Sequence, residues 1–310
     1  MIISKKILRD LQKYLVGTEE FSFNADPSAN LYPISLAFTL DDSGFYYEPV
    51  DKHGIPFKIY QSVGKQYNPT RVAAYALANY NRFIEQGCEG SRDTFIKCAN
   101  WFLGFDDAKY QYHFDWDDLR APWISCMAQG EAASVLVRAY RVTADSTYLV
   151  HAEKSLNPFF LPISEGGVQS RLDDGSVFLE EYPSNRATHV LNGFLYAMIG
   201  LHEFCDSCES EKHKALFMQL IESVSNNIGK WSSGTWSLYE DPAVKGAENF
   251  CTPSYHNLHI SQLKWVCARM ESPELRKVIS SWESGKDSLP VRIRALWGKV
   301  LFRLSNQAQR

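Results

Sequence analysis

The sequence predicts a mainly α-helical protein of the (α/α) toroid class, and three observations carry that prediction. From residue 65 onward, apolar side chains recur at helical spacing in segments that end in turn signals. About nine such segments follow one another in pairs, as in a ring of helical hairpins. Short alternating segments between the pairs predict β-hairpins inserted at the mouth of the ring. An open helical solenoid has the same local pattern and remains the alternative.

Composition indicates a large globular domain. The 310 residues are 45% hydrophobic and 14% aromatic, enough to bury a sizeable core. A formal charge of −4 and the lack of a basic run argue against a nucleic-acid partner. No stretch approaches the roughly 18 continuous apolar residues of a membrane span. Seven scattered cysteines, an odd number, predict reduced thiols and a cytoplasmic setting.

Residues 1–64 are expected to form an appendage to a helical domain that spans residues 65–310. Helical spacing in residues 1–17 predicts a docking helix without the continuous apolar run of a signal peptide. Its apolar side chains are Ile2, Ile3, Ile7, Leu8, Leu11 and Leu15. Alternation in Leu31–Leu40, followed by the turn Asp41–Gly44 and by Phe45–Tyr47, predicts a β-hairpin.

The helical domain is expected to begin with Asn68 as an N-cap, Pro69 at the first helical position and Gly87 as the stop. Residues 109–123, crowded with aromatic and acidic side chains, predict an ordered loop. Trp116 in this loop is a candidate for stacking on sugar rings, with core packing as the alternative. The other helices are expected near residues 91–104, 125–141, 145–159, 190–204, 211–228, 256–270, 273–281 and 290–304.

The segment Leu179–Pro183 is the candidate catalytic centre, because it places two carboxylates and a tyrosine where a strand pattern gives way to a helix pattern. Residues 168–182 are expected to form a hairpin around the turn Asp173–Gly175. Successive strand side chains point to opposite faces, so only one of Glu180 and Glu181 is expected to enter one cavity, unless a bulge intervenes. The alternative is a hairpin edge with a capping carboxylate and a packed tyrosine.

Four segments carry further motifs: Tyr67–Leu77, Trp123–Tyr140, Glu181–Phe194 and Tyr255–Leu263. In this order they resemble the C-terminal catalytic region of D-glucuronyl C5-epimerases, over roughly two thirds of the chain. The resemblance implies an (α/α) toroid isomerase that converts D-glucuronate to L-iduronate in a heparosan-like polymer. A bacterial capsular or exopolysaccharide glycan is the expected substrate, and the family suggests a homodimer. Neither a metal nor another cofactor is required by this reaction.

Inversion at C5 requires two acid–base groups on opposite faces of the sugar ring, and a group that neutralises the substrate carboxylate as charge develops. By motif position, the resemblance makes Glu181 and Tyr255 the opposed acid–base pair, with Tyr182 hydrogen-bonding the substrate. Glu180 is then the structural or solvated glutamate. A polyuronate lyase shares the same base and a glycoside hydrolase uses two carboxylates. Both remain alternatives, as does a catalytically inactive glycan-binding homologue.

The chain departs from the family pattern at residues 234–241, a predicted short strand. An ungapped match places Ser237 and Glu240 where family enzymes have an active-site tyrosine and, three residues later, an arginine. Tyr239 can replace the tyrosine by a two-residue shift that keeps the same strand face, whereas the arginine has no replacement there. Arg186 is the candidate for the missing cation, with a solvated loop arginine as the alternative.

Four polar residues on expected inner helices are candidate substrate contacts. Gln129 and Asn192 are expected to bind sugar hydroxyls or to satisfy backbone groups at an inserted loop. His256 and His259 lie one helical turn apart, but no third metal ligand accompanies them. One of these histidines is therefore expected to orient Tyr255 or bind hydroxyls, and the other to pack.

Overall fold

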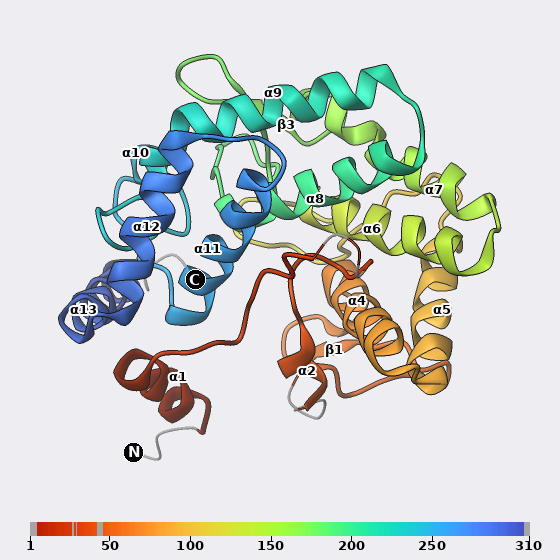
Figure 1. Cartoon of the computed structure of the whole chain (residues 1–310), viewed down its shortest axis with the longest axis horizontal. Coiled ribbons are helices and arrows are strands. Elements are labelled where there is room, and N and C mark those ends of the chain that lie inside the picture. Colours follow the sequence, from red (N-terminus) through yellow and green to blue (C-terminus); the bar gives the residue numbers. More distant parts are fainter. Residues whose placement is uncertain (1–4, 27, 29, 42–45, 307–310) are drawn as a thin grey trace.

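The structure is a computed structural model in which residues 5–26, 28, 30–41 and 46–306 are described. It confirms a mainly α-helical fold of the (α/α) toroid class (Figure 1). Within the described part of the chain, four inner helices contact one another in chain order, and each packs against the outer helix that follows it. The inner helices are α4 (Pro69–Gln86), α6 (Cys126–Thr143), α8 (Leu191–Ser207) and α11 (Pro253–Cys267). The outer helices are α5 (Glu89–Leu103), α7 (Thr147–Leu156), α9 (Glu211–Asn227) and α12 (Pro273–Asp287).

Smaller elements surround this arc of helical hairpins. The remaining helices are α1 (Lys5–Val16), α2 (Ala37–Asp41), α10 (Pro242–Lys245) and α13 (Leu289–Asn306), with short 3-10 turns at Asn157–Phe160, Ile163–Glu165 and Ile228–Trp231. The strands form two antiparallel hairpins, β1 (Lys58–Tyr60) with β2 (Gly64–Gln66), and β3 (Gln169–Arg171) with β4 (Val177–Leu179). Among the described residues, none of these helices combines the length and the apolarity that a membrane crossing needs.

Of the two predicted hairpins, the second is present, whereas the first is replaced by a hairpin that lies later in the sequence. The β3–β4 hairpin pairs Gln169 with Leu179, as expected around Asp173–Gly175. The N-terminal hairpin is formed by residues 58–66, and the predicted strand Leu31–Leu40 was wrong because Ala37–Asp41 is helical. The expected turn at residues 42–44 lies outside the described residues. Alternation alone failed here because residues 33–35 pair only over a short bridge, with residues 22–24, while the buried side chains of this stretch pack against the helical core.

Residues 21–36 close the arc by running between its two ends. At α11, the side chain of Asn257 donates a hydrogen bond to the carbonyl oxygen of Phe21. At α4, the backbone N–H of Tyr32 donates to Asn81 Oδ1 at 2.7 Å. Figure 1 shows this segment passing from α1, beside α13, across to α4. The division proposed at residue 64 stays a prediction, although Tyr32 belongs to the same core as the inner helices.

The predicted docking helix is present as α1, and it contacts α13. Tyr14 is buried in this contact, in a small cluster that includes Trp236 and Ala295. Two residues of the predicted apolar face are exposed instead, Leu11 at 37% and Leu15 at 58%. The side chains of the other predicted residues, Ile2, Ile3, Ile7 and Leu8, lie outside the described residues. The helix therefore docks through a tyrosine that the apolar pattern did not single out.

Helices α6 and α8 approach each other closely because glycines face each other at their crossing. A Cβ atom added to Gly130 would lie 2.5 Å from Ala197 Cα, and one added to Gly200 would overlap the backbone of Gly130. Real side chains cannot occupy such space, so these positions need glycine. The close contact fixes how the inner faces of both helices meet.

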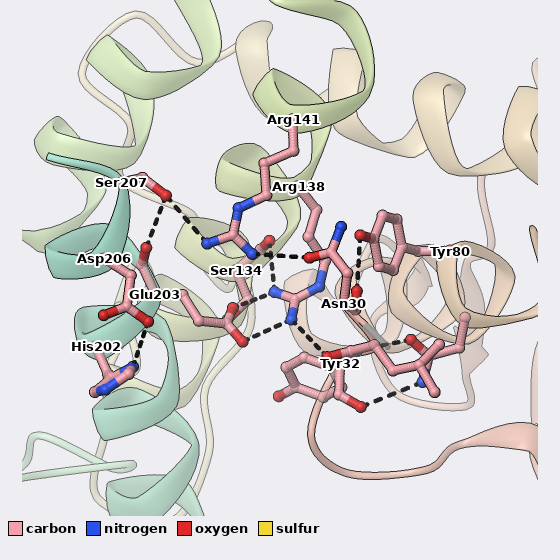
Figure 2. A network of polar contacts seen from close by, with 12 residues as sticks. Asn30, Tyr32, Tyr80, Ser134, Arg138, Arg141, His202, Glu203, Asp206 and Ser207 are labelled. Carbon is pink, nitrogen blue, oxygen red and sulfur yellow. Dashed lines mark hydrogen bonds and ion pairs between the residues drawn. The ribbon is translucent and has the colours of Figure 1, made fainter. Parts of the chain in front are cut away.

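A buried ion pair also joins these two helices, with the cation on α6 and the anion on α8 (Figure 2). Arg138 of α6 and Glu203 of α8 are 2% and 6% exposed, and Arg138 Nη2 lies 2.7 Å from Glu203 Oε1. The same guanidinium donates to the carbonyl oxygen of Leu31 and lies 5.0 Å from the ring of Tyr32. Burial alone would lower the pKa of Arg138, but the Glu203 carboxylate raises it above its usual value. The pair thus links α6, α8 and the N-terminal segment.

We expect Glu203→Ala to lower the free energy of unfolding by about 3–5 kcal/mol, because it leaves a buried guanidinium without its counter-ion. Asp206→Ala is the matched control on the same helix. Asp206 pairs with His202 but its side chain is 55% exposed, so its loss should change stability by less than about 1 kcal/mol. Urea denaturation of both variants measures the difference. Equal losses would show that Arg138 finds another partner.

Candidate functional site

A pocket of about 140 Å³ opens where the chain leaves β4. Glu181 and Tyr182 form one part of its wall, and Asn68 and Thr70 at the start of α4 form another. The loop before α6 contributes aromatic side chains, among them Trp116, which is 44% exposed. The remaining lining residues are Tyr60, Tyr112, Phe114, Trp123 and Ser125. An acidic group thus faces a largely aromatic wall, the kind of surface on which a sugar ring can stack.

Glu181 is 8% exposed and lies against the first turn of α8. Its Oε2 atom accepts a hydrogen bond from Asn192 Nδ2 at 3.4 Å, and its Cβ would be only 2.7 Å from a Cβ added to Gly193. Burial raises the pKa of Glu181 to about 7, and the Glu180 charge acts in the same direction. At neutral pH this carboxyl group is therefore near half ionisation, which suits a group that both takes and gives a proton.

Glu180 points to the opposite side, as strand alternation predicted. It is fully buried and accepts hydrogen bonds from Ser170 Oγ at 2.7 Å and from the backbone N–H of His189 at 3.0 Å. Thr188 donates to the same carboxylate through its N–H and its hydroxyl group. Glu180 is therefore structural, and it ties the segment after Glu181 back to β3.

Three tyrosines gather beside Glu181. Tyr182 lines the pocket with Glu181, and it interacts electrostatically with both Glu181 and Tyr239. The rings of Tyr239 and Tyr255 meet edge to face at 5.6 Å between centroids. Burial, followed by the Glu181 charge, raises the pKa of each of the three phenols, although Tyr255 keeps 40% exposure. The structure thus brings together all four residues predicted as catalytic.

In the segment at residues 234–241, Tyr239 is the tyrosine that interacts with Tyr182, whereas Ser237 is buried and hydrogen-bonds His256 Nδ1. That Tyr239 replaces the family tyrosine through a two-residue shift stays a prediction. Glu240, which stands where the family has arginine, accepts a hydrogen bond from Asn249 at 2.7 Å. No cation therefore comes from this segment.

Arg186 is not brought to the pocket. It is exposed, and its guanidinium donates to the carbonyl oxygen of Val244 at 3.2 Å, close to α10. Its assignment as the carboxylate-neutralising group stays a prediction that this geometry does not favour. Asn192, in contrast, lies where it was expected, beside Glu181.

Gln129 is fully buried, and both ends of its amide are used by backbone groups. It accepts from the N–H of Tyr110 and donates to the carbonyl oxygens of Ala108 and Ser155, each at 2.8 Å. This arrangement matches the alternative role, in which the amide satisfies the backbone of an inserted loop.

Both candidate histidines are fully buried. His256 stacks on Trp236 at 3.8 Å and uses its ring nitrogens on Ser237 and on the carbonyl oxygen of Trp282. His259 Nδ1 lies 3.7 Å from Cys251 Sγ. Burial lowers the pKa of each imidazole to about 3. Both rings are packed in the interior, and a role in orienting Tyr255 or binding hydroxyls stays a prediction.

The sequence reasoning missed Glu131, a second buried carboxyl group on α6. It is 1% exposed, and its Oε2 atom has no hydrogen-bond partner. Burial, reinforced by the Glu181 charge, holds its pKa well above the usual value. Its charge in turn acts on Tyr196 of α8 and on Tyr255. A glutamate in the otherwise apolar centre of an inner helix was the available signal.

The residues described hold no group of three or more His, Cys, Asp and Glu side chains that could bind a metal ion.

Tyr67, in the first motif, hydrogen-bonds Asp51 at 2.7 Å outside the pocket.

Comparison with known proteins places these residues in a family context. The family described as "D-glucuronyl C5-epimerase C-terminus" matches residues 99–284. A D-glucuronyl C5-epimerase of Caenorhabditis elegans is 30% identical over 174 residues, which cover 52% of this chain and 28% of that protein. An uncharacterized protein of Methanocaldococcus jannaschii is 24% identical over 177 residues, 56% of each chain. The chain therefore spans about a quarter to about half the length of these relatives.

Among solved structures, cellobiose 2-epimerase from Bacillus thermoamylovorans superposes with a TM-score of 0.54. The superposition covers 78% of this chain and 66% of that one, at 9% sequence identity. At this level of identity the likeness concerns the fold.

We expect Gly193→Ala to lower the free energy of unfolding by about 1–3 kcal/mol, because the new methyl group would collide with the side chain of Glu181. Gly90→Ala is the matched control. Gly90 also lies in the first turn of a helix, but nothing lies within 4 Å of an added Cβ there. That change should leave stability unchanged or raise it by up to about 1 kcal/mol. A tolerated Gly193→Ala in urea denaturation would mean that Glu181 can move away freely.

We expect Glu181→Gln to stabilise the protein at neutral pH. The folded state keeps a proton on Glu181 up to about pH 7, whereas the unfolded chain releases it near pH ~4.3. This group's contribution to the free energy of unfolding is thus greatest below pH ~4.3 and falls by about 1.4 kcal/mol per pH unit up to about pH 7. Glu181→Gln should therefore raise the free energy of unfolding by up to about 3 kcal/mol at pH 7 and by about 1 kcal/mol at pH 5. An equal gain at both pH values would contradict the raised pKa.

Proposed function

We propose that this chain, which belongs to the family described as "D-glucuronyl C5-epimerase C-terminus", inverts C5 of D-glucuronate residues in an anionic glycan to give L-iduronate. The observation that carries the proposal is the grouping of Glu181 with three tyrosines at an aromatic pocket. We extend it to a heparosan-like or bacterial capsular polysaccharide as the natural substrate. Such a chain carries one carboxylate on each uronate unit and offers sugar faces for stacking.

Glu181 is the proposed base. A carboxylate of ordinary pKa is too weak to remove a proton from a carbon atom next to a carboxylate, but the pKa of Glu181 lies at about 7. About half of the molecules then carry the ionised form at neutral pH, and that form is a stronger base than an exposed glutamate. The C5–H bond breaks as Glu181 takes the proton, and the substrate carboxylate holds the electron pair as an enolate.

Tyr255 is the proposed acid on the other face of the ring. Burial and the Glu181 charge raise its pKa, so its phenol is protonated at neutral pH, which is the form that a general acid needs. Its proton forms the new C5–H bond as the enolate collapses. The phenolate left behind lies beside the ring of Tyr239, which interacts electrostatically with Tyr182. Tyr182 also interacts with Glu181, so polar groups connect the neighbourhood of the acid with the base.

The test is incubation of the protein with N-acetylated or de-N-acetylated heparosan in D2O, followed by NMR of the C5 position. We expect deuterium at C5 together with iduronate signals. A 4,5-unsaturated product would show a lyase, and new reducing ends without unsaturation would show a hydrolase. Binding without any of these products would show a glycan-binding homologue without catalysis.

In the same assay we expect Glu181→Gln and Tyr255→Phe each to slow exchange by about 10²–10⁴-fold, because each removes one acid–base group. Tyr148→Phe is the matched control. Tyr148 lies on the outer helix α7, away from the pocket, and its hydroxyl donates to Asn100 Oδ1 at 2.6 Å. It should retain full activity. Unchanged exchange in either site variant would remove that residue from the mechanism.

A further inference from the structure

Arg71 is a partly buried cation that directly follows the pocket residue Thr70, and among the described residues it has no acidic partner. It lies in the first turn of α4, directly after the pocket residues Asn68 and Thr70. Its Nη2 atom donates to the carbonyl oxygen of Glu48 at 3.3 Å, while its Nε atom is buried and has no acceptor. Among the described residues, no carboxylate lies within ion-pair distance of this guanidinium. A guanidinium carries five N–H donors, so most of its capacity is uncommitted.

Two tyrosines lie near this cation. The guanidinium carbon lies 5.8 Å from the centroid of the Tyr47 ring, and Tyr60 acts on it electrostatically. Tyr60 itself lines the pocket. Such a site partly dehydrates the cation, and burial lowers the pKa of Arg71 accordingly. Loss of water without a counter-ion is unfavourable, and binding of an anion would relieve it.

The residue before Arg71 belongs to the same pocket as the acidic group. Tyr112 places its hydroxyl 3.5 Å from Thr70 Oγ1, and its phenol is affected by the Glu181 charge. Thr70 and Glu181 both line the pocket, and Arg71 follows Thr70 in the first turn of α4. A glycan that extends from the pocket along the start of α4 would come close to Arg71.

We propose that Arg71 binds a carboxylate of the anionic glycan beside this pocket. The inference rests on the proposed function in one respect, that the ligand is a uronate-containing chain. Planar guanidinium groups pair with carboxylates through two parallel hydrogen bonds, which a lysine cannot reproduce. Arg71 thus supplies the recognition of negative charge for which the sequence offered Arg186, and it does so from a different element of the fold.

The test compares a heparosan oligosaccharide with its carboxyl-reduced counterpart, in which each uronate has become a neutral glucose unit. Isothermal titration calorimetry at low salt measures both. The wild-type protein should bind the acidic oligosaccharide at least tenfold more tightly. Arg71→Gln should lose that preference while binding the neutral oligosaccharide as the wild type does, and Arg71→Lys should recover it only in part.

Arg82→Gln is the matched control, because it removes the same charge from the same helix. Arg82 pairs with Asp41, so its charge already has a partner, and it lies three turns further along α4. It should keep the full preference for the acidic oligosaccharide. Urea denaturation of each variant shows whether folding is intact, and Arg71→Lys keeps the test decisive if Arg71→Gln is unstable.

The inference is overturned if Arg71→Gln keeps the wild-type preference, if it weakens binding of both oligosaccharides equally, or if the wild type shows no preference or no binding. The deuterium-exchange assay separates this result from the proposed function. A preference that depends on Arg71 without exchange at C5 would reject the epimerase and leave the carboxylate site. Exchange at C5 with an undiminished preference in Arg71→Gln would reject the carboxylate site and leave the epimerase.

Discussion

The close approach of α6 and α8 is the constraint on which the rest of the structure depends. Gly130 and Gly200 leave no room for a side chain at the crossing, so the two helices meet backbone to backbone. Gly193, two turns before Gly200, gives Glu181 its place against α8 in the same way. Because the helices cannot slide apart without losing this contact, the carboxyl group of Glu181 is held in a dry and crowded position. That position, and not the residue type alone, produces its raised pKa.

The interior contains acidic groups in two contrasting states. Glu203 is paired with Arg138, and this buried pair ties α6, α8 and the N-terminal segment together. Among the described residues, no cation pairs with Glu181 or Glu131, and burial raises the pKa of both. A protein that only needed stability would not keep two such carboxyl groups in its centre, since each lowers stability at neutral pH. The contrast supports a chemical use for this side of the arc.

Most of the fold could be predicted from the sequence, because helix periodicity and capping are local. Asn68, for example, caps α4 as expected, accepting from the N–H groups of Thr70 and Arg71. The N-terminal hairpin was misplaced for the opposite reason. The alternating residues 32–36 are buried by contacts with distant helices, and period-two alternation does not reveal whether the covering element is a strand or a helix.

What the sequence by itself determined is the order of paired helices, the hairpin before Glu181 and the grouping of Glu181 with Tyr182 in one motif. Only the tertiary structure decided which polar residues share the pocket. Gln129, His256 and Arg186 turn to backbone groups or solvent, while Arg71, near the start of the helical domain, follows a pocket residue and keeps most of its donors uncommitted. The physical reason is that periodicity fixes the face of a helix on which a residue lies, but the packing of distant helices decides what that face meets.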